Sequence, residues 1–565
     1  MGSAVSEERK GLYVLHGPPG TGKTTWVAKN VKAAAERYGI DAIVVASFTR
    51  AAAKELVGRE LPIPSSAVGT LHAHCFRALG RPKIADAYLK EFGEAAGMLL
   101  TGTNISPSLE GADDRPSGLT QDDCSYMEYS RLRNLMVPRE AWPDSVRSFG
   151  RLWEAWKKEH DQLDFTDLIE IAEREMLYAP GNAQVGFFDE VQDSTPLQVK
   201  LMRSWGKSMD FFIISGDSDQ SLYSFLGARP ETMDNVGVPD SHKLFLKQSW
   251  RVPRAVQAYA QHVIVKVARR QTKDYLPREE EGSVDLRVPV KWKQPTGLVG
   301  RIEEDLARGD SVMVLAPCAY ALGPIIKELK RLAIPFGNRY RVNRADWNPL
   351  VIGGKRESSL SRLRDFVEPK HILGGEEGGP VSRIWSAKQL YAWSKLVPKD
   401  WWGRGFKTKL KVIAETGEGD TPMGMLEFLW QYATDQKYVD YMVRVVSLGT
   451  KAEALALIRA NFAPGGTISI DATDYALRCL EKAGGEFEDI VPRVTVGTIH
   501  SVKGGEASSV YLIPDVPANV YQETLLSRDA YDASIRLAYV AITRAQKRFS
   551  VLAPMTRFTL RGLYS

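Results

Sequence analysis

Short, fully apolar runs alternate along this chain with stretches of helical periodicity. The first two runs, Leu12–Leu15 and Ala42–Ala46, flank a helical stretch from about Thr24 to Tyr38 that stops at Gly39. Short apolar strands separated by helices are typical of a parallel sheet covered on both faces. The same type of run recurs at Val185–Phe188, Phe211–Ile214, Val312–Leu315, Val510–Ile513 and Phe549–Leu552. The pattern therefore predicts α/β architecture, occurring twice along the chain.

Two stretches interrupt the alternation. Residues 80–160 have a mainly helical period and include a polar, turn-rich segment from Thr101 to Asp123. Residues 345–485 begin with a glycine-rich, charged segment and then become helical. We interpret both as mainly helical insertions into α/β lobes. The predicted division is a first lobe at 1–79 and 161–245 with the insertion 80–160, and a second lobe at 246–344 and 486–565 with the accessory insertion 345–485.

Length and composition place few limits on the class of protein. The chain has 565 residues, too many for one hydrophobic core, with 44% hydrophobic and 25% charged residues, which is ordinary for a globular protein. No apolar run reaches the roughly 18 residues of a membrane span, and the N-terminus lacks the apolar core of a signal peptide. The expected location is therefore the cytoplasm.

Charge and cysteine usage add little more. The net charge of +5 and the pI of about 8.7 permit nucleic-acid binding without arguing for it. The cysteines are far apart and form no CxxC pair, which argues against a zinc or iron–sulfur site and fits a reducing compartment. They are Cys75, Cys124, Cys318 and Cys479.

A glycine-rich segment with the pattern GxxxxGK[ST] follows the first apolar run and opens the first helical stretch. In such a P-loop the glycines let backbone N–H groups turn toward phosphate oxygens. The lysine, Lys23, can reach the β and γ phosphates, and the hydroxyl of Thr24 can coordinate Mg²⁺. The predicted nucleotide-binding residues here are Gly17, Pro18, Pro19, Gly20, Thr21, Gly22, Lys23, Thr24 and Thr25.

A pair of adjacent carboxylates follows the apolar run Val185–Phe188. Asp189 is placed to hold Mg²⁺, directly or through water, and Glu190 is placed to orient and deprotonate an attacking water. A surface acidic pair after a strand would look the same. Together with the P-loop, however, the pair predicts a site for nucleotide phosphates and Mg²⁺.

Further segments continue this signal in a fixed order. They are Ser47–Ala53, Thr70–Cys75, Leu163–Ile169, Asp189–Asp193, Gly216–Ala228, Leu246–Arg251, Thr498–Glu506 and Tyr539–Ala545. They resemble motifs Ia and Ib, the LDFxDLI element and motifs II to VI of superfamily 1 DNA helicases of the UvrD, PcrA and Rep group. An ordered set of motifs is far more specific than any one of them.

The resemblance implies a fold and an activity. The fold is a P-loop NTPase with two RecA-like lobes and ATP between them. The activity is ATP-dependent movement on single-stranded DNA and unwinding of duplex DNA, driven by alternating closure of the lobes. The DExQD form of motif II and Lys503-Gly504 in motif V resemble the branch that moves 3′ to 5′. The implied partners are single-stranded DNA and its junctions with duplex, bound by a monomer.

The resemblance also implies residue roles. Gln220 would contact the γ-phosphate, and Arg251 and Arg544 would act as arginine fingers. Glu506 would contact the ribose, and Trp250 would stack on the adenine. The bound strand would lie against Phe48, Thr49, Thr70, His72, Phe225, His500 and Lys503. The structural alternatives are core aromatics, core histidines with satisfied hydrogen bonds and ordinary surface arginines.

Some positions depart from the family pattern. No glutamine precedes Gly17 to read adenine, so the sequence does not predict strict preference for ATP. Motif III has Phe225-Leu226 where the family has tryptophan and arginine. Two other functions fit the same motor residues, an RNA helicase and an NTPase switch that binds nucleic acid without unwinding it. A small-molecule kinase would leave every motif after Asp193 unexplained.

The accessory insertion combines tryptophans with a basic stretch from Lys399 to Lys411. Such a surface could contact nucleic acid. The other interpretation, which we favour, is core tryptophans beside a solvated basic face. The tryptophans are Trp347, Trp385, Trp393, Trp401, Trp402 and Trp430.

Overall fold

The computed structural model describes residues 11–48, 53, 56–102, 119–341, 344–352, 357–373, 382–397, 399–460 and 470–564. The chain forms two compact units. Unit 1 comprises Met1–Pro289, Leu315–Ala321 and Thr498–Ser565, and unit 2 comprises Val290–Val314 and Leu322–Gly497. The predicted Thr49 contact lies outside the described residues, and the predicted lobe boundaries remain a prediction.

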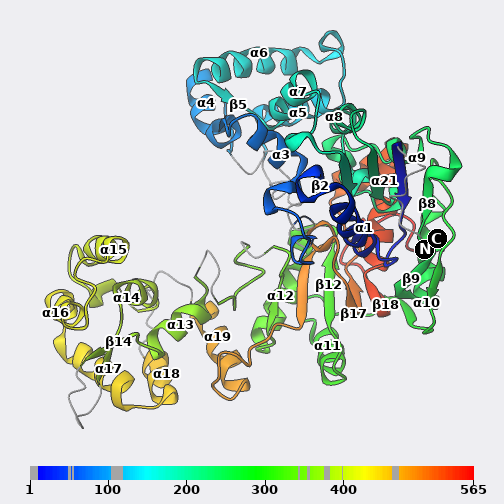
Figure 1. Ribbon diagram of the computed structural model, residues 1–565. Helices are drawn as coiled ribbons and strands as arrows, with labels where there is room; N and C mark the ends of the chain where they lie inside the picture. The colour runs from blue at the N-terminus through cyan, green and yellow to red at the C-terminus, as the bar shows by residue number, and fades with distance from the viewer. Residues whose placement is uncertain are drawn as a thin grey trace. The chain divides into compact units, whose positions relative to one another are not determined.

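A six-stranded sheet in the order β3-β2-β6-β7-β1-β8 forms the first part of unit 1 (Figure 1). Every strand pairs parallel with its neighbours. The strands are β1 (Gly11–His16), β2 (Ile43–Ser47), β3 (Val68–Thr70), β6 (Val185–Asp189), β7 (Phe211–Gly216) and β8 (Lys243–Phe245).

Apolar side chains leave both faces of this sheet, because successive strand residues point to opposite sides. Tyr13 and Phe187 pack with α1 (Lys23–Tyr38) in one hydrophobic cluster. Val14 and Phe188 pack in another, with α3 (Leu71–Ala78), α7 (Phe165–Glu175) and α8 (Pro196–Gly206). The two clusters explain why the strands read as unbroken apolar runs.

Helices α4 (Leu89–Ala96), α5 (Gln121–Asn134) and α6 (Asp144–Glu159) make up most of the first insertion, around an aromatic core. A buried ionic network joins α5 and α6 to α7. Arg133 contacts Asp164 at 2.9 Å, and Lys157 contacts the same carboxylate at 2.6 Å. Asp164 is also the N-cap of α7, with Asp167 completing the capping box. The LDFxDLI element is therefore an anchor between the insertion and the sheet.

The second large sheet has the order β11-β18-β17-β12-β16-β13. Its strands are β11 (Ser283–Val288), β12 (Val312–Ala316), β13 (Phe336–Gly337), β16 (Val494–Thr498), β17 (Ala507–Leu512) and β18 (Ala545–Leu552). The pairs β11–β18, β17–β18 and β13–β16 are parallel. The predicted α/β class with two parallel sheets is confirmed.

Unit 1 also contains helices and strands outside the two large sheets and the helices described above. They are β4 (Lys83–Ile84), β5 (Gln162–Leu163), α9 (Glu231–Asp234), β9 (Gln248–Pro253), α10 (Arg254–Ile264), β10 (Leu276–Arg278), α20 (Ala518–Leu526) and α21 (Arg528–Ile542). In the part of the chain that the structure describes, no helix is long and apolar enough to cross a membrane.

Unit 2 consists mainly of helices. Its helices are α11 (Thr296–Ala307), α12 (Gly323–Arg331), α13 (Ser359–Val367), α14 (Ala387–Trp393), α15 (Phe406–Thr416), α16 (Pro422–Tyr432), α17 (Gln436–Leu448), α18 (Lys451–Ala460) and α19 (Ile470–Lys482), with the antiparallel pair β14 (His371–Leu373) and β15 (Ser382–Ile384).

The tryptophans of unit 2 are mostly core residues. The indoles of Trp347, Trp385, Trp393 and Trp402 are buried. Trp401 is half-buried and stacks on Tyr438, and Trp430 is exposed. For the four buried side chains the core interpretation is confirmed.

His74 on α3 should make unfolding of unit 1 depend on pH. Its Nε2 lies 3.0 Å from the carbonyl oxygen of Val45, and burial lowers its pKa from 6.5 to about 4. Between pH 6.5 and pH 4 the His74 side chain is protonated in the unfolded chain but not in the folded chain. The free energy of unfolding therefore falls as the pH falls through this range. Between pH 7 and pH 5 this amounts to about 2 kcal/mol.

Urea unfolding of the wild type and of His74→Gln at both pH values measures that difference. Wild type is expected to lose about 2 kcal/mol more than the variant on going to pH 5. His16, whose pKa burial also lowers to about 4, is present in both proteins and cancels. Equal losses would show that His74 does not titrate in this way.

Candidate nucleotide and nucleic-acid site

The P-loop connects β1 to α1. Gly20 and Gly22 have φ angles of 71° and 82°, in the left-handed region that favours glycine. A Cβ on Gly17 would lie 2.0 Å from Cγ of Lys23. The Lys23 side chain therefore crosses the loop, and its ammonium donates to the carbonyl oxygen of Gly17 at 2.9 Å. The loop therefore curves around a space. In P-loop proteins this is the space where backbone N–H groups bind phosphate.

The start of α1 offers further groups to an anion. Its N-cap is Gly22, no side chain caps it and no acidic residue lies in its first turn. With no acidic residue in its own first turn, the helix N-terminus favours a negatively charged ligand. Thr24 is half-buried, and Thr25 accepts a hydrogen bond from Arg59 at 2.9 Å. Pro18 accepts from the Thr21 hydroxyl at 2.8 Å, which stiffens the loop.

Asp189 ends β6 and is buried, with the hydroxyl of Ser215 donating to its Oδ1 at 2.5 Å. Burial and the neighbouring charge of Glu190 raise the pKa of Asp189 to about 6. A divalent cation would reverse that shift, since it favours the ionised carboxylate. The oxygen donors Asp189 and Thr24 belong to the type that Mg²⁺ prefers, so they fit the ion.

Glu190 has a left-handed backbone, with φ 59°, which is rare for a residue other than glycine. Its carboxylate lies 3.8 Å from the ammonium of Lys23 and accepts a hydrogen bond from Gln192 at 2.6 Å. Burial opposes its charge, but Lys503 and Lys23 lower the pKa of Glu190 to about 2. It is therefore an ionised carboxylate beside the P-loop lysine.

Gln220 and Arg544 contact each other. The side-chain amide of Gln220 donates to Asp217 at 2.8 Å and accepts from Arg544 at 2.7 Å. The guanidinium of Arg544 is buried and also donates to the carbonyl oxygens of Val540 and Gly505. Motifs III and VI are thus joined through one amide.

Arg251 and Glu506 form an ion pair at 2.5 Å, and Gln546 donates to the second oxygen of Glu506. Strand β9 also lies against the P-loop, because the N–H of Trp250 donates to the carbonyl oxygen of Gly20 at 2.8 Å. The Trp250 side chain is 71% exposed. Its indole therefore stands open beside the loop, where it can stack on a flat ring.

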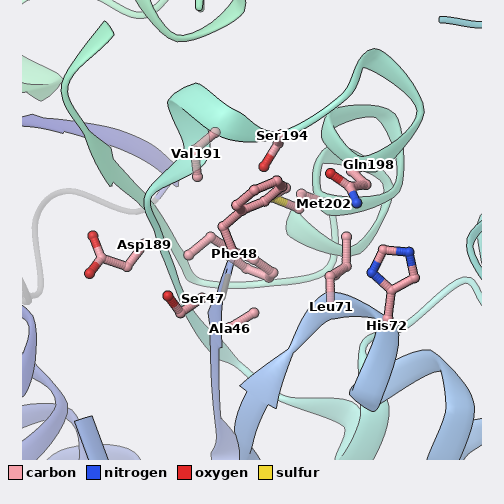
Figure 2. A pocket seen from close by; sticks show the side chains of 11 residues that line it. Ala46, Ser47, Phe48, Leu71, His72, Asp189, Val191, Ser194, Gln198 and Met202 are labelled. Atoms are coloured by element: carbon pink, nitrogen blue, oxygen red, sulfur yellow. The ribbon is translucent and has the colours of Figure 1, made fainter. Parts of the chain in front are cut away.

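An aromatic row runs from Phe48 through Tyr223 to Phe225 and His500. The ring centroids of Phe48 and Tyr223 are 5.2 Å apart, and those of Phe225 and His500 are 5.9 Å apart. Figure 2 shows Phe48 among the residues that line a pocket, with Asp189 on one side of it and His72 on the other. This row is half-buried except for Tyr223, which is buried.

The other predicted strand contacts have structural partners. His72 lies edge-on to Phe165, with ring centroids 6.0 Å apart. Thr70 is buried, and its hydroxyl caps α3 by accepting from the N–H of Ala73.

Lys503 lies between the aromatic row and the carboxylates of Glu190 and Asp193. Its ammonium lies 3.0 Å from Glu190, contacts the buried carboxylate of Asp193 and stands 5.8 Å from the ring centroid of Tyr223. A predicted strand contact thus reaches the group predicted to activate water.

Several residues in this arrangement carried no predicted role. Tyr223, Gln192 and Asp193 lie inside the recognised motifs, so their positions were visible but not their contacts. Asp217 also lies in motif III, whereas its buried partner Lys273, at 2.9 Å, lies in no motif. Nothing in the sequence near Lys273 distinguishes it from a surface lysine.

Comparison with known proteins gives two family matches. Residues 2–238 match the UvrD/REP helicase N-terminal domain, and residues 473–553 match the UvrD-like helicase C-terminal domain. The chain is 22% identical over 628 residues to the ATP-dependent DNA helicase PcrA of Leuconostoc citreum, covering 98% of this chain and 81% of that protein. It is 24% identical over 600 residues to the ATP-dependent DNA helicase Rep of Escherichia coli, covering 94% and 87%.

A third similarity is partial. The chain is 25% identical over 336 residues to the putative ATP-dependent DNA helicase YjcD of Bacillus subtilis. That alignment covers 54% of this chain and 44% of that protein.

Proposed function

The chain belongs to the UvrD/REP family of ATP-dependent DNA helicases, and we propose that it moves 3′ to 5′ on single-stranded DNA and unwinds duplex ahead of it. Lys503 carries the proposal. Its ammonium is 3.0 Å from Glu190, the proposed base for water, and 5.8 Å from the Tyr223 ring in the aromatic row. A strand on that row would lie within reach of the hydrolysis site, as coupling requires.

The proposed ATP site combines groups with separate tasks. The P-loop and Lys23 bind the phosphates, while Glu190 orients and deprotonates water. Mg²⁺, held by Thr24 and Asp189, would neutralise charge on the phosphates. Arg251 and Arg544 stabilise the charge that develops during transfer, and Gln220 reports the γ-phosphate.

Movement in this proposal follows from differential contact. Bound γ-phosphate favours the closed form of the two predicted lobes, because only that form brings Arg251 and Arg544 to it. Hydrolysis removes the contact and the lobes open. Stacking of bases on aromatic rings is worth about 1–3 kcal/mol per base and tolerates any sequence. Stacking of bases on Phe48 and Phe225 would therefore suit a motor that must move over every base sequence.

Steady-state ATP hydrolysis with and without single-stranded DNA tests the coupling, and single-stranded RNA of the same sequence tests the alternative substrate. We expect strong stimulation by DNA. Stimulation by RNA alone would replace the proposal with an RNA helicase, and full activity without either would favour an uncoupled NTPase.

Polarity is tested by strand displacement on duplexes with a single-stranded tail. We expect unwinding from a 3′ tail and none from a 5′ tail of equal length, since the family resemblance implies loading on that strand. A blunt duplex and ATP omission are the controls. Activity confined to 5′ tails would reverse the proposed direction, and DNA-stimulated hydrolysis without displacement would leave a translocase.

A further inference from the structure

A buried cluster of four charges lies beside Gln220. Lys273 contacts Asp217 at 2.9 Å and Asp219 at 3.6 Å, and Arg270 contacts Asp219 at 2.9 Å. Asp217, Asp219 and Lys273 are each less than 5% exposed, and the side chain of Arg270 is 7% exposed. Neither cation belongs to any of the motifs that define the nucleotide site.

The cluster reaches the nucleotide site through Asp217. One oxygen of that carboxylate accepts from Lys273, and the other accepts from the amide of Gln220 at 2.8 Å. Because the amide nitrogen of Gln220 faces Asp217, its oxygen faces Arg544, which donates to it at 2.7 Å. The orientation of the Gln220 amide therefore depends on a carboxylate that Lys273 holds from the opposite side.

A buried carboxylate keeps its charge only if it is paired. Burial opposes the charge on Asp217, but Lys273 holds the pKa of Asp217 below its ordinary value. Without the ammonium, Asp217 would take up a proton or turn toward another donor. Protonation weakens the acceptor that fixes the Gln220 amide, and rotation removes it.

We propose that Lys273 is a positioning residue for γ-phosphate recognition: by holding Asp217, it sets the Gln220 amide in the orientation that distinguishes ATP from ADP. The inference rests on the proposed role of Gln220. In this proposal Lys273 acts on the nucleotide through Asp217 and not by a contact of its own.

The test uses Lys273→Met in the full chain, with Lys266→Met as the matched control. The ammonium of Lys266 donates to the carbonyl oxygen of Gly562. The control substitution therefore removes one lysine charge at a position outside motif III. Affinities for ADP and for a non-hydrolysable ATP analogue are measured separately. We expect the preference of Lys273→Met for the analogue over ADP to be about tenfold lower than that of the wild type, with the affinity for ADP unchanged. The control should keep the wild-type preference.

A double-mutant cycle with Gln220→Ala separates positioning from general destabilisation. If Lys273 acts through Gln220, Lys273→Met lowers kcat by about tenfold in the wild-type background and by less than about twofold beside Gln220→Ala. Equal losses in both backgrounds, or an unchanged ATP-to-ADP preference, would overturn the inference.

The isosteric change Asp217→Asn is the second variant, because it removes a buried charge and keeps the volume. It should reduce the ATP-to-ADP preference as Lys273→Met does, and wild-type preference in Asp217→Asn overturns the inference even where Lys273→Met does not fold. A wild-type protein without DNA-stimulated hydrolysis would refute the proposed function, whereas the nucleotide affinities would still test Lys273.

Discussion

Glu190→Gln is expected to lower the kcat for ATP hydrolysis by about 10²–10⁴-fold, the usual contribution of a general base. The amide keeps the size of the side chain but cannot accept a proton from water. The carboxylate that it replaces is ionised, since Lys503 and Lys23 hold the pKa of Glu190 at about 2 in spite of burial. Affinity for ATP should stay within about threefold of wild type, because the P-loop supplies the phosphate contacts.

Single-turnover hydrolysis with saturating DNA, together with nucleotide binding by fluorescence titration, measures both quantities. Glu36→Gln, an exposed position on α1, is the matched control and should hydrolyse ATP at the wild-type rate. Retention of more than about one tenth of wild-type kcat in Glu190→Gln would exclude Glu190 as the base.

Arg544→Lys is expected to lower kcat by about 10³-fold, within the range for arginine fingers. The guanidinium donates at once to Gln220, Gly505 and Val540, and an ammonium on a flexible chain cannot reproduce that planar arrangement. The positive charge remains, so the change tests geometry more than net charge.

Arg548→Lys on β18, four residues further along the chain, is the control, since Arg548 donates to Ser509 on β17. Thermal unfolding of both variants shows whether the fold is retained. A folded Arg544→Lys with near wild-type kcat would mean that Arg544 is a structural link between motifs, not a finger.

The strands were predictable from the sequence because a strand that is buried on both faces of its sheet has apolar residues at every position. Val185–Phe188 and Phe211–Ile214 lie inside β6 and β7. The helix expected from Thr24 to Tyr38 begins one residue earlier, at Lys23. Ile513 falls just outside β17, which ends at Leu512, because an apolar run records burial and not the end of hydrogen bonding.

Residue contacts were less predictable than residue types. Motif spacing identified Gln220 and Arg544 but could not show that they share a hydrogen bond. The role of Lys273 could not be predicted from the sequence, because a lysine is normally exposed and only the fold places this one beside two buried carboxylates. The tryptophans of unit 2 likewise have the same composition whether they form a core or a binding face.

The contacts of Lys503 have a thermodynamic consequence. Under the proposed function, the carboxylates of Glu190 and Asp193 compete with the phosphates of the strand for one ammonium. Strand and nucleotide are then ligands of a single coupled equilibrium, and such coupling is reciprocal. The factor by which DNA changes the dissociation constant of the nucleotide must equal the factor by which the nucleotide changes that of DNA, so two independent titrations have to return the same number.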